Sequence, residues 1–292
     1  MNAQTKMAIV AIVVVIPLTS VVVYGTNTNQ EFTSNDNSKL QAISSFNPLH
    51  EFSQIVGGEK IDVTLLVPVG VEPHDWEPTI KDVQQMHKSD FIIINGIGFE
   101  NWVDNLIENN YQGTIVDTSK QIPIKETDPH IWLNPVFAIN QVGNIALAFS
   151  NSDPENREYY MTNAAKYSEE LQSLDSKIRT DLTDCKRDFI AFHDAFSYFA
   201  DEYDLNQHTI VATTNSHGEV TAKTLENVIS TARELNIKVI FSEETVNTKT
   251  SQIIANEIGG KVLVLSPLEI VSEDNYISKM TQNLENLKEA LC

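Results

Sequence analysis

Short apolar runs alternate with segments of helical periodicity from Leu40 to the C-terminus. The runs include "KIDVTLLV", "FIIING" and "GTIVDTS" in the first half of the chain, and "IKVIF" and "KVLVLS" in the second. Strands that are joined through helices pair in parallel. The alternation therefore predicts an α/β fold in which helices cover both faces of parallel sheets.

The longest uninterrupted helical pattern is "PENREYYMTNAAKYSEELQSLDSKIRTDL", after which the strand and helix rhythm starts again. Pro154 stands at its start and Asp153 is a candidate N-cap. At 292 residues the chain is long enough for two lobes. We predict lobes at residues 39–152 and 183–292, joined by one long rigid helix over residues 153–182, which should limit hinge motion.

The N-terminal segment has a different character. The stretch "MAIVAIVVVIPLTSVVVYG" carries no charge and follows "MNAQTK". An apolar run of about 18 residues is typical of a signal peptide or an N-terminal membrane anchor, so we assign residues 1–25 to one of these. Residues 26–38 are polar and predict a tether. The remainder is expected outside the cytoplasmic membrane, where Cys185 and Cys292 are free to form a disulfide.

The composition excludes some partners. The net charge is −20 at pH 7, from 40 acidic and 20 basic residues. Nucleic acids and anionic membrane surfaces bind clustered Lys and Arg, so we expect neither as a partner, and membrane contact only through the N-terminal segment. An acidic surface favours solubility and the approach of cations.

Three of the seven histidines lie where α/β proteins collect ligand-binding groups, just past the carboxyl ends of strands. His74 follows "KIDVTLLV" within "PHDWEPT", and His130 follows "GTIVDTS" within "DPHIWLNP". His193 ends the strand that opens the second lobe, within "AFHDAFSYF". A single histidine beside apolar residues is usually structural, but three in equivalent positions indicate a shared ligand.

The other four histidines are weaker candidates. His50 and His87 fall on predicted helices, where packing and surface roles are more common, and His208 precedes a predicted strand. His217 lies in the loop "TNSHGEV" and stays a further candidate ligand.

The motifs "PHDWEPT", "NGIGFENW", "DPHIWLNP" and "AFHDAFSYF", in this order, resemble the metal-binding solute-binding proteins of zinc and manganese ABC transporters, the cluster A-I group. The resemblance runs from Leu40 nearly to the C-terminus. It implies that His74, His130 and His193 bind a metal ion in the cleft between the lobes, with a carboxylate of the second lobe as fourth ligand. It also implies delivery of Zn(II), the transported ligand, to an ABC permease by a monomeric protein that is not an enzyme.

The fourth ligand is less certain from the residues. Some relatives supply an aspartate from a "DPLG"-type motif, which reads "LSPLE" here, with Ser266 in the place of that aspartate. The resemblance therefore points to Glu269. Glu243 and Glu244, in "FSEET", also follow a predicted strand and are competing carboxylates. The sequence lacks the histidine-rich loop that many zinc-specific relatives carry between the first two histidine motifs.

Three imidazoles with one carboxylate favour zinc, whereas manganese members of the family typically use two histidines and two carboxylates. The alternatives are a Mn(II)- or Fe(II)-binding protein of the same family and, from other classes, a zinc hydrolase or an adhesin. A hydrolase needs an open coordination position and a general base, and the compact HExxH pair is absent.

Residues beside the candidate ligands are predicted to support them. Asp194, next to His193, is a candidate acceptor that would orient an imidazole, or else an exposed loop carboxylate. Trp76 and Trp132 flank two of the histidines and either shield the site or pack in the core.

Overall fold

The computed structural model describes residues 39–125, 128–212, 220–244 and 246–292. The segments predicted over residues 1–25 and 26–38, and the loop that contains His217, lie outside the described residues. Residues 39–292 form one compact unit. Within the described residues, no helix combines the length and the apolar character that crossing a membrane requires.

The first half of this unit is built on a four-stranded parallel sheet with strand order β2-β1-β3-β4. Its strands are β1 (Leu40–Ser44), β2 (Ile61–Leu65), β3 (Phe91–Ile94) and β4 (Thr114–Asp117). The connecting helices are α1 (Asn47–Gly57), α2 (Ile80–Met86) and α3 (Val103–Glu108). Helix α1 ends at Gly57, and the following residue, Gly58, adopts a φ of 50° that favours glycine.

The second half repeats this arrangement with strand order β6-β5-β7-β8, again all parallel. Its strands are β5 (Asp188–His193), β6 (Asn206–Val211), β7 (Val239–Ser242) and β8 (Lys261–Val264). Its helices are α6 (Ser197–Glu202), α7 (Ala222–Glu234) and α8 (Lys249–Ile258). The predicted α/β class with two parallel-sheet halves is confirmed.

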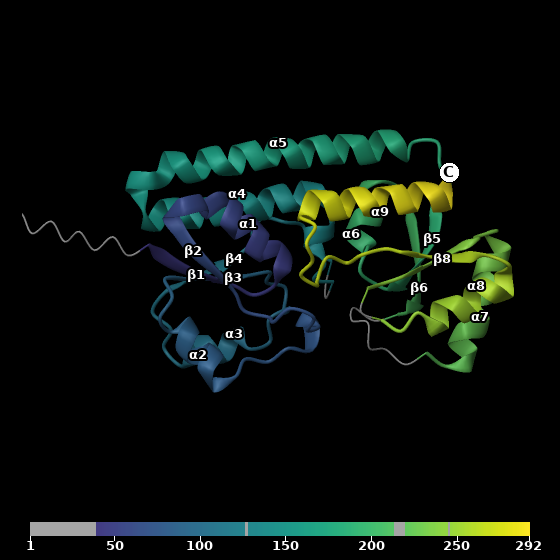
Figure 1. The fold of residues 1–292 in the computed structure, drawn as a ribbon, viewed down its shortest axis with the longest axis horizontal. Helices are drawn as coiled ribbons and strands as arrows, with labels where there is room; N and C mark the ends of the chain where they lie inside the picture. The colour runs from purple at the N-terminus through teal and green to yellow at the C-terminus, as the bar shows by residue number, and fades with distance from the viewer. Residues whose placement is uncertain (1–38, 126–127, 213–219, 245) are drawn as a thin grey trace, which may run out of the picture. The chain divides into compact units, whose positions relative to one another are not determined.

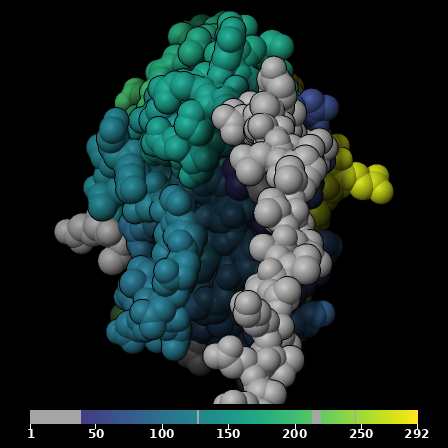
Figure 2. Space-filling view, turned by 90° about the vertical axis from the view of Figure 1, so that its left-hand side faces the viewer, coloured from purple at the N-terminus to yellow at the C-terminus, as the bar shows by residue number. Residues whose placement is uncertain are grey.

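The three longer helices are α4 (Pro135–Ser152), α5 (Arg157–Asp181) and α9 (Tyr276–Leu291), and of these α4 packs on the first half, α9 packs on the second half and α5 runs across both (Figure 1). Helix α5 is 25 residues long, and it contacts α1 and α4 of the first half and α9 of the second. In Figure 2, which looks at the first half, residues of α5 in teal lie above the blue residues of that half. The predicted long helix is therefore present.

One local prediction was wrong and another was confirmed. Asp153 precedes a 3-10 turn, Pro154–Asn156, and its carboxylate accepts from the hydroxyl of Tyr160, so it does not cap α5. The strand that opens the second half ends at His193, as predicted, because the next residues turn and the backbone N–H of Ala195 donates to the carbonyl of His193 at 3.0 Å. The aromatic residues after this turn belong to α6.

The halves share a core and a covalent link. The main apolar cluster includes buried side chains from both halves, among them Phe46, Trp132 and Tyr276. A disulfide joins Cys185, which follows α5, to Cys292, which follows α9, with 4.6 Å between their Cα atoms. The pairing that the sequence left open is therefore formed, and it connects the ends of two of the long helices.

Candidate metal centre

The four predicted ligands all follow strands of the two sheets. His74 lies in a 3-10 turn after β2, and His130 immediately precedes another 3-10 turn after β4. His193 is the last residue of β5, and Glu269 follows β8. Since the carboxyl ends of parallel strands lie at one edge of a sheet, each half presents two of these side chains at the edge where α/β proteins bind ligands.

These four side chains meet, with their ligand atoms all within 4.8 Å of one another. The Nε2 atom of His130 lies 3.2 Å from Nε2 of His74 and 3.3 Å from Nε2 of His193. The Oε1 atom of Glu269 lies 3.1 Å from Nε2 of His74 and 3.4 Å from Nε2 of His130. Ligands at about 2.0–2.1 Å from a tetrahedral ion are separated by about 3.3–3.4 Å, so these spacings fit such an ion.

Carboxylates fix the orientation of two imidazoles. Oδ1 of Asp128 lies 2.7 Å from Nδ1 of His130, and Oε1 of Glu243 lies 2.5 Å from Nδ1 of His193. An ionised carboxylate only accepts, so each Nδ1 carries a proton and each ring points its Nε2 atom at the other ligands. Lone pairs that converge at these distances repel unless a cation, either a proton or a metal ion, lies between them.

The site is buried and acidic. His130 and His193 are fully buried, and Glu269 is 4% exposed. Burial lowers the pKa of His130, but hydrogen bonds to Asp128 and Glu269 outweigh burial and raise it to about 9. Burial opposes ionisation of Glu269, yet its hydrogen bonds with His130 and His74 hold its pKa well below the usual value. Without a metal the site therefore retains a proton on His130 at neutral pH.

The backbone before Glu269 turns its carboxylate toward the histidines. Leu268 is buried and adopts a φ of 62°, a left-handed conformation that costs an ordinary residue about 1–2 kcal/mol. The side chain of Asn283 bonds the amide and the carbonyl of Ser266, both at 2.8 Å. Nε1 of Trp132 donates to the carbonyl of Pro267 at 2.7 Å. These contacts place Glu269, rather than Ser266, among the candidate ligands.

The competing carboxylates have other partners. Glu243 contacts the far nitrogen of His193, and Glu244 pairs with Lys279 at 3.0 Å. Asp194 accepts from the side-chain amide of Gln207 and not from an imidazole, so of the two roles that the sequence left open it does not take the orienting one. The orienting role belongs to Glu243, which the sequence analysis considered only as a ligand.

The sequence analysis assigned no role at the site to Asp128. Its Oδ1 also accepts from the backbone N–H of His130 at 3.0 Å, a contact that aspartate commonly makes two residues along the chain. The Asp-Pro-His spacing was therefore an available signal for the carboxylate that orients His130.

Aromatic residues surround the histidines. The ring of Phe99, from "NGIGFENW", lies edge-on to His74 with ring centroids 4.7 Å apart, and it also packs against Trp132 at 5.3 Å. Trp132 is fully buried and touches the ring of His130, so it serves both the core and the site. Trp76 packs edge-on against Trp102, with ring centroids 6.3 Å apart.

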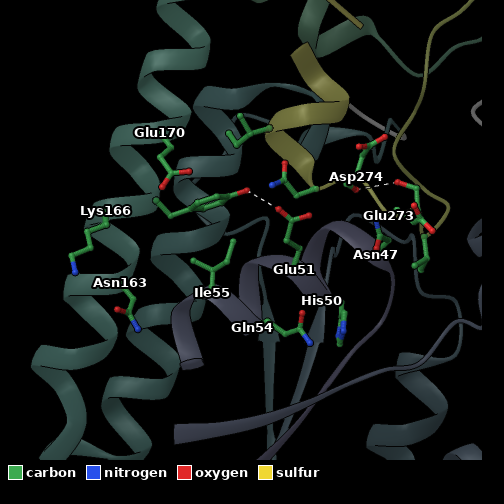
Figure 3. Close-up of a pocket in the computed structure, with 15 residues that line it drawn as sticks. Asn47, His50, Glu51, Gln54, Ile55, Asn163, Lys166, Glu170, Glu273 and Asp274 are labelled. Carbon is green, nitrogen blue, oxygen red and sulfur yellow. Dashed lines mark hydrogen bonds between the residues drawn. The ribbon is translucent and has the colours of Figure 1, made fainter. Parts of the chain in front are cut away.

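The remaining described histidines lie elsewhere. His87 follows α2 and its ring lies edge-on to that of Tyr111, and His208 lies within β6, not before it, with its Nε2 atom 3.0 Å from Oδ1 of Asp188. His50, on α1, lines a cavity of 690 Å³ between α1, α5 and the segment that leads into α9 (Figure 3). None of the four candidate ligands lines that cavity. In the described part of the chain, no second group of three or more His, Cys, Asp or Glu side chains converges as a metal site would require.

Comparison with known proteins supports this assignment of the fold. The family model described as zinc-uptake complex component A, periplasmic, matches residues 43–290. The high-affinity zinc uptake system protein ZnuA of Bacillus subtilis is 36% identical over 295 residues, covering 91% of this chain and 92% of the relative. The manganese-binding lipoprotein MntA of Halalkalibacterium halodurans is 30% identical, covering 95% of this chain and 97% of the relative.

A solved structure agrees with these matches. The Zn(II)-bound ZnuA-like domain of Streptococcus pneumoniae AdcA superposes with a TM-score of 0.77 at 32% identity, covering 87% of this chain and 99% of that domain. The resemblance to the cluster A-I group is therefore confirmed. The chain belongs to the family of zinc-uptake complex component A, whose members are metal-binding solute-binding proteins of ABC uptake systems and not enzymes.

Proposed function

We propose that the protein captures Zn(II) outside the cytoplasmic membrane and delivers it to the permease of an ABC transporter. The observation that carries this proposal is the convergence of three imidazole nitrogens and one carboxylate oxygen from both halves of the chain, with four of the six distances between them at 3.1–3.4 Å. Capture requires ligands that fit the ion, and delivery requires that they can be drawn apart. Ligands divided between two halves meet both requirements.

The donor set supports zinc over manganese as the transported ion. Mn(II) favours carboxylate, carbonyl and water oxygens in octahedral sites, whereas three nitrogens and one oxygen in a tetrahedron suit Zn(II). Asp128 and Glu243 do not add oxygen ligands, because each bonds the far nitrogen of a histidine. The chain resembles a manganese-binding relative as well, so a direct competition between the two ions is the deciding test.

The binding step follows from the protonation of the site. Zn(II) replaces the proton on His130, while Asp128 and Glu243 keep the imidazoles of His130 and His193 in the tautomer that exposes Nε2. Burial excludes water, and four protein ligands leave no open position for a reactive water. The arrangement therefore supports retention of the ion and not hydrolysis.

We also propose that residues 1–25 export the protein or anchor it in the membrane, and that one copy is sufficient for binding. Each chain brings all four candidate ligands together by itself, so the proposed site needs no residue from a second copy.

The test is metal analysis of protein purified without chelator, followed by competition between Zn(II) and Mn(II). We expect one tightly bound zinc per chain and displacement of manganese by zinc. Glu269→Ala should weaken zinc binding by roughly 10- to 100-fold or more, whereas Glu244→Ala, a carboxylate paired with Lys279, should leave it unchanged. Preferential retention of manganese, or an equal loss in both variants, would contradict the proposal.

A further inference from the structure

The segment that carries His130 contacts the second half of the chain on both sides of that histidine. Two residues before it, the carboxylate of Asp128 accepts a hydrogen bond from the hydroxyl of Ser197. Two residues after it, Trp132 donates to the carbonyl of Pro267 at 2.7 Å. Both partners lie close in the chain to candidate ligands of the second half, since Ser197 follows His193 and Pro267 precedes Glu269.

Asp128 therefore joins a ligand from one half to a hydroxyl from the other. Its Oδ1 accepts from the backbone N–H and from Nδ1 of His130, at 3.0 and 2.7 Å. Its Oδ2 accepts from Ser197, the first residue of α6. A carboxylate that is held by donors on both oxygens has little freedom to rotate, and so the imidazole that it orients has little freedom either.

Neighbouring contacts hold Ser197 in this position. The hydroxyl of Tyr198 donates to the carbonyl of Asp128 at 3.0 Å and accepts from the backbone N–H of Lys125 at 2.7 Å. The ring of Tyr198 is buried with Ile122 and Ile131 of the first half. The start of α6 is thus inserted into the first half, and the bond from Ser197 is part of a packed contact.

We propose that Ser197 is a positioning residue that makes retention of the metal depend on contact between the two halves. When the halves are in contact, its hydroxyl completes the hydrogen bonding of Asp128 and so fixes His130. When the ligand-bearing edges of the two halves move apart, Asp128 loses that donor in the same movement that withdraws His193 and Glu269. His130 is then less well oriented, so the ion is released from all four ligands together. This inference rests on the proposed metal capture and concerns its regulation.

The experiment measures the rate at which Zn(II) leaves the full chain after mixing with an excess of a chelator. Ser197→Ala should release zinc about tenfold faster, since loss of a partner that orients a ligand typically costs 10- to 100-fold in affinity. Ser197→Thr keeps a hydroxyl and should stay within about threefold of the unmodified rate.

Lys125→Met is the matched control. The ammonium of Lys125 bonds the carbonyl of Ser197 at 3.0 Å and pairs with Asp201, so this variant loosens the same contact without touching the carboxylate of Asp128. Its release rate should be unchanged. If Lys125→Met and Ser197→Ala release zinc equally fast, general loosening explains the effect and the inference is wrong.

A spectroscopic measurement separates positioning from loss of stability. The NMR signal of the Nδ1 proton of His130 should shift or broaden in Ser197→Ala and stay in place in Ser197→Thr and Lys125→Met. An unchanged signal and release rate in Ser197→Ala would overturn the inference while leaving metal capture intact. Failure of the unmodified protein to bind zinc would instead overturn the proposed function.

Discussion

Zinc binding should release protons, and the structure predicts how many. Hydrogen bonds to Asp128 and Glu269 raise the pKa of His130 to about 9 against the opposing effect of burial, so at pH 7 this imidazole is almost fully protonated before the metal binds. The ion needs the lone pair of Nε2, and about one proton must therefore leave. Two pH units between pH 7 and the pKa correspond to about 100-fold in apparent affinity, or about 2.7 kcal/mol. From His130 alone, the apparent affinity should rise about tenfold per pH unit from pH 6 to 8.

Isothermal titration calorimetry in buffers with different ionisation enthalpies counts the released protons. Glu72 is a second source, because burial and the charge of Glu269 raise its pKa to about 7, and zinc should lower that pKa. Glu72→Gln removes this contribution, so the protons that remain belong to the histidines. Release of about one proton in this variant at pH 7 is the expected result. A value near zero, or an affinity that does not change between pH 6 and 8, would refute the protonation scheme.

Three further predictions concern the residues around the site and the fold. Glu243→Ala should weaken zinc binding about 10- to 100-fold in a titration, because the carboxylate orients His193, whereas Glu243→Gln, which keeps an acceptor, should lose less. Replacing Cys185 and Cys292 by serine should lower the free energy of unfolding by about 4–5 kcal/mol, since the disulfide closes a loop of 107 residues; denaturant titration without reductant would show no difference if the bond were not formed. Burial raises the pKa of Glu100 to about 7, so its contribution to stability is present below about pH 4.5 and lost as the pH rises through 7. Relative to Glu100→Gln, the free energy of unfolding of the unmodified protein should fall by about 3 kcal/mol between these pH values. Parallel curves of unfolding free energy against pH for the two proteins would contradict this.

The sequence predicted the fold class and the edge of the sheets at which the site lies. Alternating strands and helices determine parallel pairing, and parallel pairing places every strand's carboxyl end on one side. His74, His130 and His193 were chosen on that ground, and the structure brings them together with Glu269.

The local sequence pattern could not decide which carboxylate is the fourth ligand. Glu243 and Glu269 both follow strands of the second sheet, and what separates their roles is the backbone between β8 and Glu269. The left-handed turn at Leu268 and the bond from Trp132 to Pro267, between residues 135 positions apart, depend on tertiary packing. A strand pattern carries no information about either.

The contacts between the two halves could not be predicted from the sequence either. The bond from Ser197 to Asp128 joins residues 69 positions apart, and nothing in "AFSYF" marks the serine as a partner of "DPH". The disulfide was a similar case, because pairing requires the ends of α5 and α9 to lie together.

The central claim is that three imidazoles and one carboxylate hold a tetrahedral zinc ion. X-ray absorption at the zinc edge, on protein loaded with one equivalent of Zn(II), tests it most directly. The predicted spectrum shows four nitrogen and oxygen ligands at about 2.0–2.1 Å, with multiple scattering from three imidazoles, and one imidazole fewer in His193→Ala. A five- or six-coordinate ion, or a spectrum that His193→Ala leaves unchanged, would contradict the claim.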